Sequence, residues 1–261
     1  MKTSNINRRL TYFNKRNLLF IAFMCIASNL IAQINGEVNF QNMHLWRGME
    51  VTDGFVLTTD LSVSDRKKHF KFGFWGGTNA NGSYKEFNNY ISYTKGKFKV
   101  ALWDTYNFSP DAAYNNREFF NYNARETGRF LDATISYSGS KKVPLSVSWS
   151  TIIFGRDRDG LNSKNRYSTF VFAEYSAWQD GLWEVKPGIG AAFAFVYGRN
   201  VEGERSKEHF YGDDFGIVHV SLCSVYKLSI ARYNMPITVM AMWNPQSSKG
   251  YLQVGIQLFS F

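Results

Sequence analysis

Apolar and polar residues alternate with a period of two along most of the chain after about residue 33. In 131–138 and 145–153 the odd positions are mostly apolar, and Ser, Thr and Asp dominate the even ones. In 252–258 the apolar residues occupy the even positions. This period is typical of strands with one face in an apolar and one in a polar environment. No comparable helical period follows residue 33, so the pattern predicts an all-β fold.

The alternating runs predict twelve antiparallel strands, separated by short segments rich in turn residues. An even number of strands, each beside the next in sequence, predicts an up-and-down β-barrel with both chain ends on one side. The predicted strands lie at about 37–49, 55–64, 69–78, 84–94, 98–108, 128–138, 143–155, 166–177, 182–197, 215–230, 235–243 and 250–261.

The lengths of the connections support this count. All even-numbered connections are short, whereas the three long segments, 109–127, 156–165 and 198–214, fall at connections five, seven and nine. Outer-membrane barrels have short periplasmic turns and longer extracellular loops. The asymmetry therefore favours a transmembrane β-barrel over a secreted β-sandwich or lipocalin-like barrel, the alternative that periodicity alone leaves open.

Aromatic residues make up 17% of the chain. Tryptophans near the predicted strand ends are typical of the aromatic girdles at the two lipid interfaces. The chain ends on Phe259-Ser260-Phe261, and a terminal aromatic residue resembles the signal read by outer-membrane assembly machinery. Phe259 and Phe261 occupy odd positions, whereas the apolar residues of 252–258 occupy even ones, so the two terminal rings are out of phase with the strand before them. The tryptophans assigned to girdles are Trp46, Trp103, Trp178, Trp183 and Trp243.

Residues 1–32 have the pattern of a secretory signal peptide, which leaves 33–261 as the barrel. Five basic residues precede an apolar stretch, Leu18–Ile31, that is too short for a membrane-spanning helix. Cleavage is expected after Ala32. The basic residues are Lys2, Arg8, Arg9, Lys15 and Arg16.

Removal of the signal changes the interpretation of the net charge. The full chain carries 30 Lys and Arg against 21 Asp and Glu, a charge of +9. The signal peptide contains five basic and no acidic residues, so the mature chain has 25 Lys and Arg against 21 Asp and Glu, a charge of +4. The basic excess therefore does not indicate a nucleic-acid partner. Cys223 is the one cysteine that remains, so no disulfide forms within the mature chain.

The segment 42–54 carries two short motifs, Trp46-Arg47-Gly48 and Thr52-Asp53-Gly54. It resembles the opening hairpin of the TorF-like porins, a family of outer-membrane proteins. The resemblance extends over most of the mature chain, including the Asn244-Pro245 turn and the last strand. It implies a porin-like barrel in the bacterial outer membrane, and it implies no particular substrate and no catalytic residue.

Ten charged residues are predicted to face the lumen, five of each sign. A balanced set suits either a plug of cross-strand salt bridges or a narrow, weakly selective pore. Arg47, placed on the first strand, could select anions or neutralise a lumenal carboxylate such as Asp60. The second role is favoured because an unpaired charge in a narrow lumen is costly. The predicted pore-lining residues are Arg47, Asp60, Lys71, Glu86, Lys99, Asp132, Glu174, Glu184, Lys186 and Lys227.

The long segment 109–127 interleaves aromatic rings with amide side chains. This combination suits a sugar, a nucleoside or a protein surface, because rings stack and amides both donate and accept hydrogen bonds. In the alternative, the rings close the loop on itself or lie at the outer lipid boundary. The candidate loop-binding residues are Tyr114, Phe119, Phe120 and Tyr122.

No convincing catalytic or metal site emerges, and no cofactor is expected. His209 lies near Asp213 and Asp214, but a solvated loop tip is the favoured interpretation. His219 and Ser221, two positions apart on a strand, are expected about 6.5–7 Å apart, too far for a direct relay. The segment 157–162 resembles half of a calcium loop but lacks the distal Glu, so a salt-bridged loop is favoured.

The sequence therefore predicts a non-enzymatic, porin-like barrel surrounded by outer-membrane lipid. Small solutes would diffuse passively through a narrow, weakly selective lumen. A plugged barrel with a structural or partner-binding role, docking a protein through its extracellular loops, is the alternative. A barrel hydrolase is the third possibility and the weakest.

Overall fold

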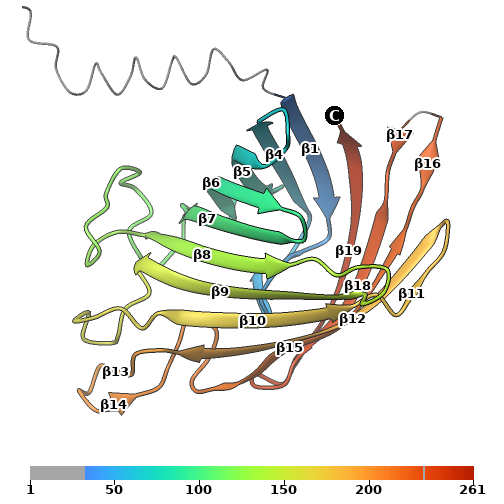
Figure 1. Ribbon diagram of the computed structural model, residues 1–261. Coiled ribbons are helices and arrows are strands. Elements are labelled where there is room, and N and C mark those ends of the chain that lie inside the picture. Colours follow the sequence, from blue (N-terminus) through green and yellow to red (C-terminus); the bar gives the residue numbers. More distant parts are fainter. Residues whose placement is uncertain (1–32, 232) are drawn as a thin grey trace, which may run out of the picture.

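The computed structural model describes residues 33–231 and 233–261, so the predicted signal peptide lies outside the described residues. Twelve antiparallel strands form one closed barrel, in which β1 pairs with both β4 and β19. This confirms the predicted architecture (Figure 1). The barrel strands are β1 (Gln33–Gln41), β4 (Val56–Ser64), β5 (Phe70–Asn79), β6 (Lys85–Lys95), β7 (Phe98–Asn107), β8 (Arg129–Tyr137), β9 (Leu145–Gly155), β10 (Ser168–Tyr175), β12 (Trp183–Ala194), β15 (Gly216–Tyr226), β18 (Ile237–Asn244) and β19 (Lys249–Ser260).

Seven shorter strands lie in the connections and form local hairpins or extensions. They are β2 (His44–Trp46), β3 (Met49–Thr52), β11 (Trp178–Gln179), β13 (Gly198–Arg199), β14 (Arg205–Ser206), β16 (Ser229–Ile230) and β17 (Tyr233–Asn234). The long loops emerge at the opposite end of the barrel from the C-terminus (Figure 1). The predicted asymmetry of the connections is therefore confirmed.

The outward positions of the strands carry a continuous belt of apolar side chains. Phe72 is 44% exposed and Val220 is 36% exposed, so neither belongs to an interior core. Water would not stabilise such a surface, whereas lipid does, and barrel closure satisfies the backbone groups that lipid cannot. The belt includes Leu57, Leu61, Val63, Phe74, Val100, Leu102, Ile135, Trp149, Leu222, Leu252 and Val254. Within 33–231 and 233–261, no helix is long and apolar enough to cross a membrane.

Two of the five tryptophans assigned to the lipid girdles lie elsewhere. Trp178, Trp183 and Trp243 are between 41% and 53% exposed on the outer surface. Trp103 instead points inward and stacks on Tyr90, with ring centroids 4.3 Å apart. Trp46 also lies inside the barrel. For these two residues the prediction was wrong, because proximity to a strand end does not fix which face a ring occupies.

A bulge in β19 explains why the terminal phenylalanines are out of phase with the rest of that strand. Asn39 pairs with Gln257 but Val38 pairs with Phe259, so Leu258 is an extra residue. An extra residue shifts the alternation of everything beyond it to the other face. Phe259 and Phe261 are accordingly 45% and 67% exposed, and both can lie in the apolar belt.

The largest departure from the predicted strands concerns the first one, predicted at 37–49. β1 ends at Gln41, and residues 44–52 turn back as the hairpin β2–β3, which pairs only with itself. We call residues 44–52 the lumen hairpin, because its side chains pack inside the barrel. Arg47 was predicted to lie on the first strand, and this was wrong, because it lies at the turn of the lumen hairpin.

Candidate functional site in the barrel lumen

The turn of the lumen hairpin has an uncommon backbone conformation. Arg47 and Gly48 connect β2 to β3, and their φ angles are +49° and +85°. Two-residue hairpin turns with positive φ at both central positions match the twist of the strands, and glycine favours them. A bulky residue such as Arg47 adopts positive φ at a cost of about 1–2 kcal/mol. Contacts elsewhere must hold it there.

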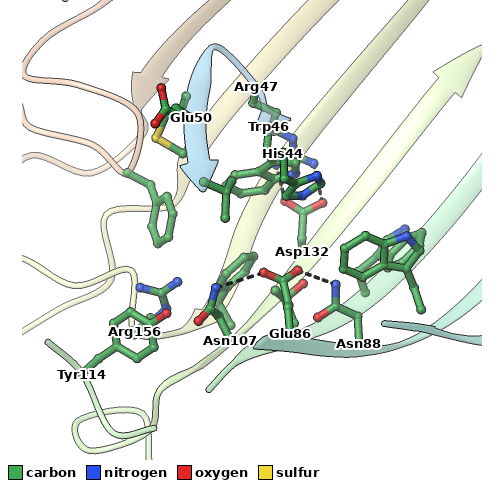
Figure 2. A pocket seen from close by; sticks show the side chains of 17 residues that line it. His44, Trp46, Arg47, Glu50, Glu86, Asn88, Asn107, Tyr114, Asp132 and Arg156 are labelled. Atoms are coloured by element: carbon green, nitrogen blue, oxygen red, sulfur yellow. Dashed lines mark hydrogen bonds and ion pairs between the residues drawn. The ribbon is translucent and has the colours of Figure 1, made fainter. Parts of the chain in front are cut away.

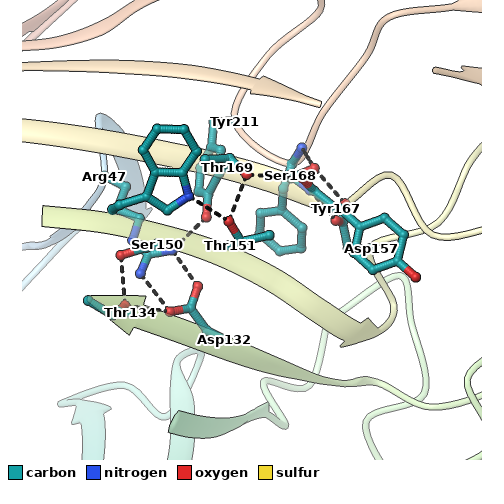
Figure 3. A network of polar contacts seen from close by, with 12 residues as sticks. Arg47, Asp132, Thr134, Ser150, Thr151, Asp157, Tyr167, Ser168, Thr169 and Tyr211 are labelled. Atoms are coloured by element: carbon teal, nitrogen blue, oxygen red, sulfur yellow. Dashed lines mark hydrogen bonds and ion pairs between the residues drawn. The ribbon is translucent and has the colours of Figure 1, made fainter. Parts of the chain in front are cut away.

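A bidentate ion pair holds Arg47. Its guanidinium donates to both carboxylate oxygens of Asp132 on β8, at 2.6 and 2.9 Å, and to the Tyr211 hydroxyl at 2.6 Å (Figure 3). Both partners are almost fully buried. Arg47 therefore pairs with Asp132 and not with Asp60, which accepts a hydrogen bond from Tyr90 at 2.9 Å instead.

Asp132 is oriented by the barrel wall. Thr134 donates to its Oδ1 at 2.9 Å, and the Thr134 hydroxyl lies 2.7 Å from that of Ser150 on β9 (Figure 3). The carboxylate thus has partners on two sides, the wall and the hairpin. Several donors fix the orientation of the carboxylate, which makes it a suitable anchor for an arginine.

The lumen hairpin also contributes to the apolar core of the protein. Trp46 and Met49 pack against a cluster on the inner wall, and Phe210 and Tyr211 of the loop 195–215 join them. The core therefore lies inside the barrel, between the hairpin and strands β8, β9, β10, β12 and β15. Its buried members are Phe130, Ile152, Phe170, Ala192, Tyr211 and Val218.

A cavity of about 550 Å³ remains on the other side of the hairpin, against β5, β6, β7 and β8 (Figure 2). Rings from the hairpin and the wall surround it, and polar side chains point into it between the rings. Its lining includes His44, Trp46, Trp75, Trp103, Tyr114, Phe130 and Phe210, together with Arg47, Glu50, Glu86, Asn88, Asn107, Asp132 and Arg156.

Three charged residues of this cavity, Glu50, Glu86 and Arg156, have no ionic partner among the described residues. Glu86 accepts hydrogen bonds from the amides of Asn88 at 2.8 Å and Asn107 at 3.3 Å (Figure 2). Arg156 lies 3.7 Å above the ring of Tyr114. Burial lowers the pKa of the Arg156 guanidinium, which Tyr114 and Glu86 partly oppose.

The other predicted pore-lining residues lie apart from this cavity. Lys186 of β12 and Glu174 of β10 form a half-buried ion pair of 3.4 Å. Lys71, Lys99 and Glu184 occupy inward positions of β5, β7 and β12, and Lys227 lies just beyond β15. In the described part of the chain these four form no ion pair. The predicted plug of cross-strand salt bridges is thus limited to two pairs.

The four candidate loop-binding residues separate into three roles. Phe119 and Tyr122 stack on the buried guanidinium of Arg129, at 4.2 and 5.1 Å from the ring centroids. The Arg129 Nε also donates to the carbonyl of Phe119 at 2.6 Å. Phe120 is 83% exposed, and Tyr114 lines the cavity. Two of the four rings therefore close the loop on itself, the alternative considered from the sequence.

The structure changes the interpretation of two histidines. His209 is buried, not solvated, and its Nε2 lies 2.8 Å from the carbonyl of Asp214. His219 and Ser221 are in direct contact, with Nε2 and Oγ 2.8 Å apart, because the two side chains lean together. The expectation that they lie too far apart was wrong. No described residue hydrogen-bonds the Nδ1 of His219, so within 33–231 and 233–261 the pair has no orienting third group of the kind found in a hydrolase triad.

The aspartates of the loop after β9 accept hydrogen bonds. Asp157 accepts from the backbone and hydroxyl of Ser168, both at 2.7 Å. Asp159 accepts from Ser163 and from the backbone of Lys164 and Arg199. Burial alone would raise the pKa of Asp159, but these donors lower it to about 2. Both carboxylates thus fix the course of the loop.

Sequence reasoning missed several residues of the cavity. Trp75, Asn88, Asn107 and Arg156 come from separate strands or strand ends, and none belongs to a motif. Their inward positions follow from strand alternation. That they share one cavity depends on the register of β5 to β9, which the sequence does not specify.

Comparisons with known proteins give similarities of low identity. No protein-family model matches the chain, and no curated protein matches it. Among solved structures, an outer membrane channel from Pseudomonas putida F1 has a TM-score of 0.42 and 9% identity, covering 87% of this chain and 94% of that one. Two variants of the Rh. blastica porin each give a TM-score of 0.33, at 8% and 9% identity, covering 88% of this chain and all of theirs. The resemblance to TorF-like porins stays a prediction, and the function is inferred from the chain's own residues.

Proposed function

We propose that the protein is a porin-like channel of the outer membrane, through which small solutes diffuse passively. The observation that carries this proposal is the incompletely filled lumen. The hairpin and its core occupy the side of β8 to β15, whereas about 550 Å³ remains free beside β5 to β8. A structural plug would be expected to fill both sides.

The apolar outer belt supports a location in a membrane, because strands that face lipid must be apolar outside while their inner face stays polar. The signal peptide inferred from the sequence favours export to the bacterial outer membrane. A barrel of twelve strands lies between eight-stranded barrels filled by side chains and porins with wide aqueous channels. A narrowed passage is the function that fits this size.

The lumen hairpin would set the width of the passage, and its ion pair would keep it in place. If Asp132 becomes Asn, the buried guanidinium of Arg47 loses its charged partner at a cost of about 3–5 kcal/mol. We expect the hairpin to leave the core and the passage to widen. The Asp132→Asn variant should then show larger single-channel steps than the wild type.

Planar-bilayer recording of the purified, refolded protein tests this. The wild type should give small, discrete steps with weak ion selectivity. Asp214→Asn serves as the control, because it removes an exposed ion pair with Lys207 in an outer loop. Failure to conduct over many insertions would overturn the proposal in favour of a plugged barrel that acts through partners. Equal steps in wild type and Asp132→Asn would show that the hairpin does not limit the passage.

A further inference from the structure

Arg47, Arg129 and Arg156 each stack on aromatic rings, and among the described residues two of the three have a carboxylate partner. Arg47 pairs with Asp132, and Arg129 pairs with Asp104 at 2.8 Å. Arg156 lies over Tyr114, Phe210 and Phe130, at 3.7, 4.9 and 5.3 Å from the ring centroids. Of the three, Arg156 is therefore the arginine whose charge is not paired with a carboxylate of a described residue.

The side chain of Arg156 has no hydrogen bond to any described residue, and its Nε is buried without a partner. A guanidinium has five donors in a planar fork that matches a carboxylate. Leaving such donors unsatisfied in a buried place is costly, so a bound group that accepts them would be stabilised. The guanidinium lines the cavity, where a solute can reach it (Figure 2).

Glu86 lines the same cavity and has the opposite charge. It accepts hydrogen bonds from two neutral amides, Asn88 and Asn107, and forms no ion pair with any described residue. Arg156 interacts with it electrostatically, but the two form no ion pair. The cavity is therefore lined by one cationic group without an ion pair, Arg156, and by two such carboxylates, Glu86 on the barrel wall and the more exposed Glu50 on the lumen hairpin. Trp75 and Trp103 also line it.

We propose that this cavity binds a zwitterionic solute of the amino-acid or short-peptide class, with its carboxylate on Arg156 and its ammonium on Glu86. An apolar or aromatic side chain of the solute would lie against the tryptophan rings. The proposal rests on the proposed channel function and names the solute class that the passage favours. The volume of the cavity is within the range of small-molecule sites.

Other solute classes satisfy the cavity less completely. An anion would meet Arg156 but face Glu86, and a cation would meet Glu86 but face Arg156. A neutral sugar could stack on the rings, yet it would leave both charges without a counter-charge. Only a solute with both charges neutralises the two groups together, which favours the zwitterion.

Calorimetric titration of the purified barrel in detergent tests the assignment with four probes. These are L-phenylalanine, its amide, which keeps only the ammonium, its N-acetyl derivative, which keeps only the carboxylate, and glucose. We expect L-phenylalanine to bind most tightly. Loss of either charged group should weaken binding about 10- to 100-fold, as for hydrogen bonds between charged groups.

Two variants assign the groups. Arg156→Gln should weaken binding of L-phenylalanine to the level of its amide and leave binding of the amide unchanged. Glu86→Gln should weaken binding of L-phenylalanine to the level of its N-acetyl derivative and leave binding of the N-acetyl derivative unchanged. Arg156→Lys keeps the charge without the fork, so an intermediate affinity is expected.

Arg158→Gln and Glu202→Gln are the matched controls. Arg158 donates to Asn162 and Asn165 and does not line the cavity, and Glu202 is exposed in an outer loop. Equal binding of L-phenylalanine and its amide, tighter binding of glucose, or variants that weaken all probes alike would each overturn the inference. If the barrel conducts but gives any of these results, the solute class is wrong and the channel function stands. If the barrel binds L-phenylalanine as expected but never conducts, the channel function is wrong and the binding site stands.

Discussion

Gly48, at the turn of the lumen hairpin, lies directly against the carbonyl oxygen of Val218 on β15. A Cβ placed on Gly48 would be 2.0 Å from that oxygen. Val218 is there because of a bulge: Gly190 pairs with His219 and Ala191 pairs with Ile217, which leaves Val218 as an extra, fully buried residue. One added residue in the wall thus creates the contact surface for the hairpin, as bulges near functional sites commonly do.

The variant Gly48→Ala should displace the lumen hairpin, because the backbone oxygen of Val218 cannot move aside within the barrel wall. We expect larger single-channel steps in planar bilayers and faster proteolysis of the segment 42–55. Gly54→Ala is the matched control in the same loop. Its φ is +83°, like the +85° of Gly48, but a Cβ there would meet no atom within 4 Å. If both variants behave alike, backbone strain and not the contact with Val218 explains the result.

The docking of the hairpin should weaken in acid because of His44. Its Nδ1 accepts a hydrogen bond from Gln41, and its ring lies near those of Trp75 and Tyr84. Burial lowers the pKa of His44 from 6.5 to about 4. A released hairpin would expose His44 with its ordinary pKa, so the docked state is fully favoured above pH 6.5. The free energy that favours the docked over the released hairpin decreases by up to roughly 3 kcal/mol as the pH falls toward 4.

Conductance should therefore rise between pH 7 and pH 4.5 in the wild type. His44→Phe keeps the ring contacts and removes the titration, so most of the rise should disappear. Burial also lowers the pKa of His209, in the loop that packs on the hairpin. A small rise in conductance caused by His209 is therefore expected to remain in His44→Phe. An undiminished rise in His44→Phe would exclude His44 as the cause.

Phe119 and Phe120 are neighbours in sequence, yet only the substitution of Phe119 should loosen the loop. Phe119 covers the guanidinium of Arg129, whereas Phe120 is 83% exposed. Phe119→Ala removes a cation–π contact of about 0.5–2 kcal/mol and should loosen the loop 108–128. Trypsin should then cleave faster at Arg117 and Arg125, while Phe120→Ala should leave the rate unchanged. Faster cleavage in Phe120→Ala alone would contradict this account.

The sequence by itself determined the number of barrel strands, their antiparallel order and, away from the bulges and the lumen hairpin, the face that most strand residues occupy. Those features follow from a period of two and from turn residues, which are local properties of the chain. The outward belt of residues such as Phe72 and Val220 could therefore be predicted, and so could the inward positions of Asp132 and Glu86.

Tertiary structure decided what lies inside the lumen. The pattern of apolar and polar residues at Trp46-Arg47-Gly48 is compatible with a continuation of β1. The segment turns inward instead, because Arg47 forms an ion pair with Asp132, 85 positions away in the sequence. The bulges at Val218 and Leu258 shift the phase of single strands, and no local pattern marks them. Arg156 forms no ion pair with any described residue, and Glu86 of the same cavity accepts hydrogen bonds from two amides instead. Such pairings depend on contacts between distant residues, which the period of a strand does not encode.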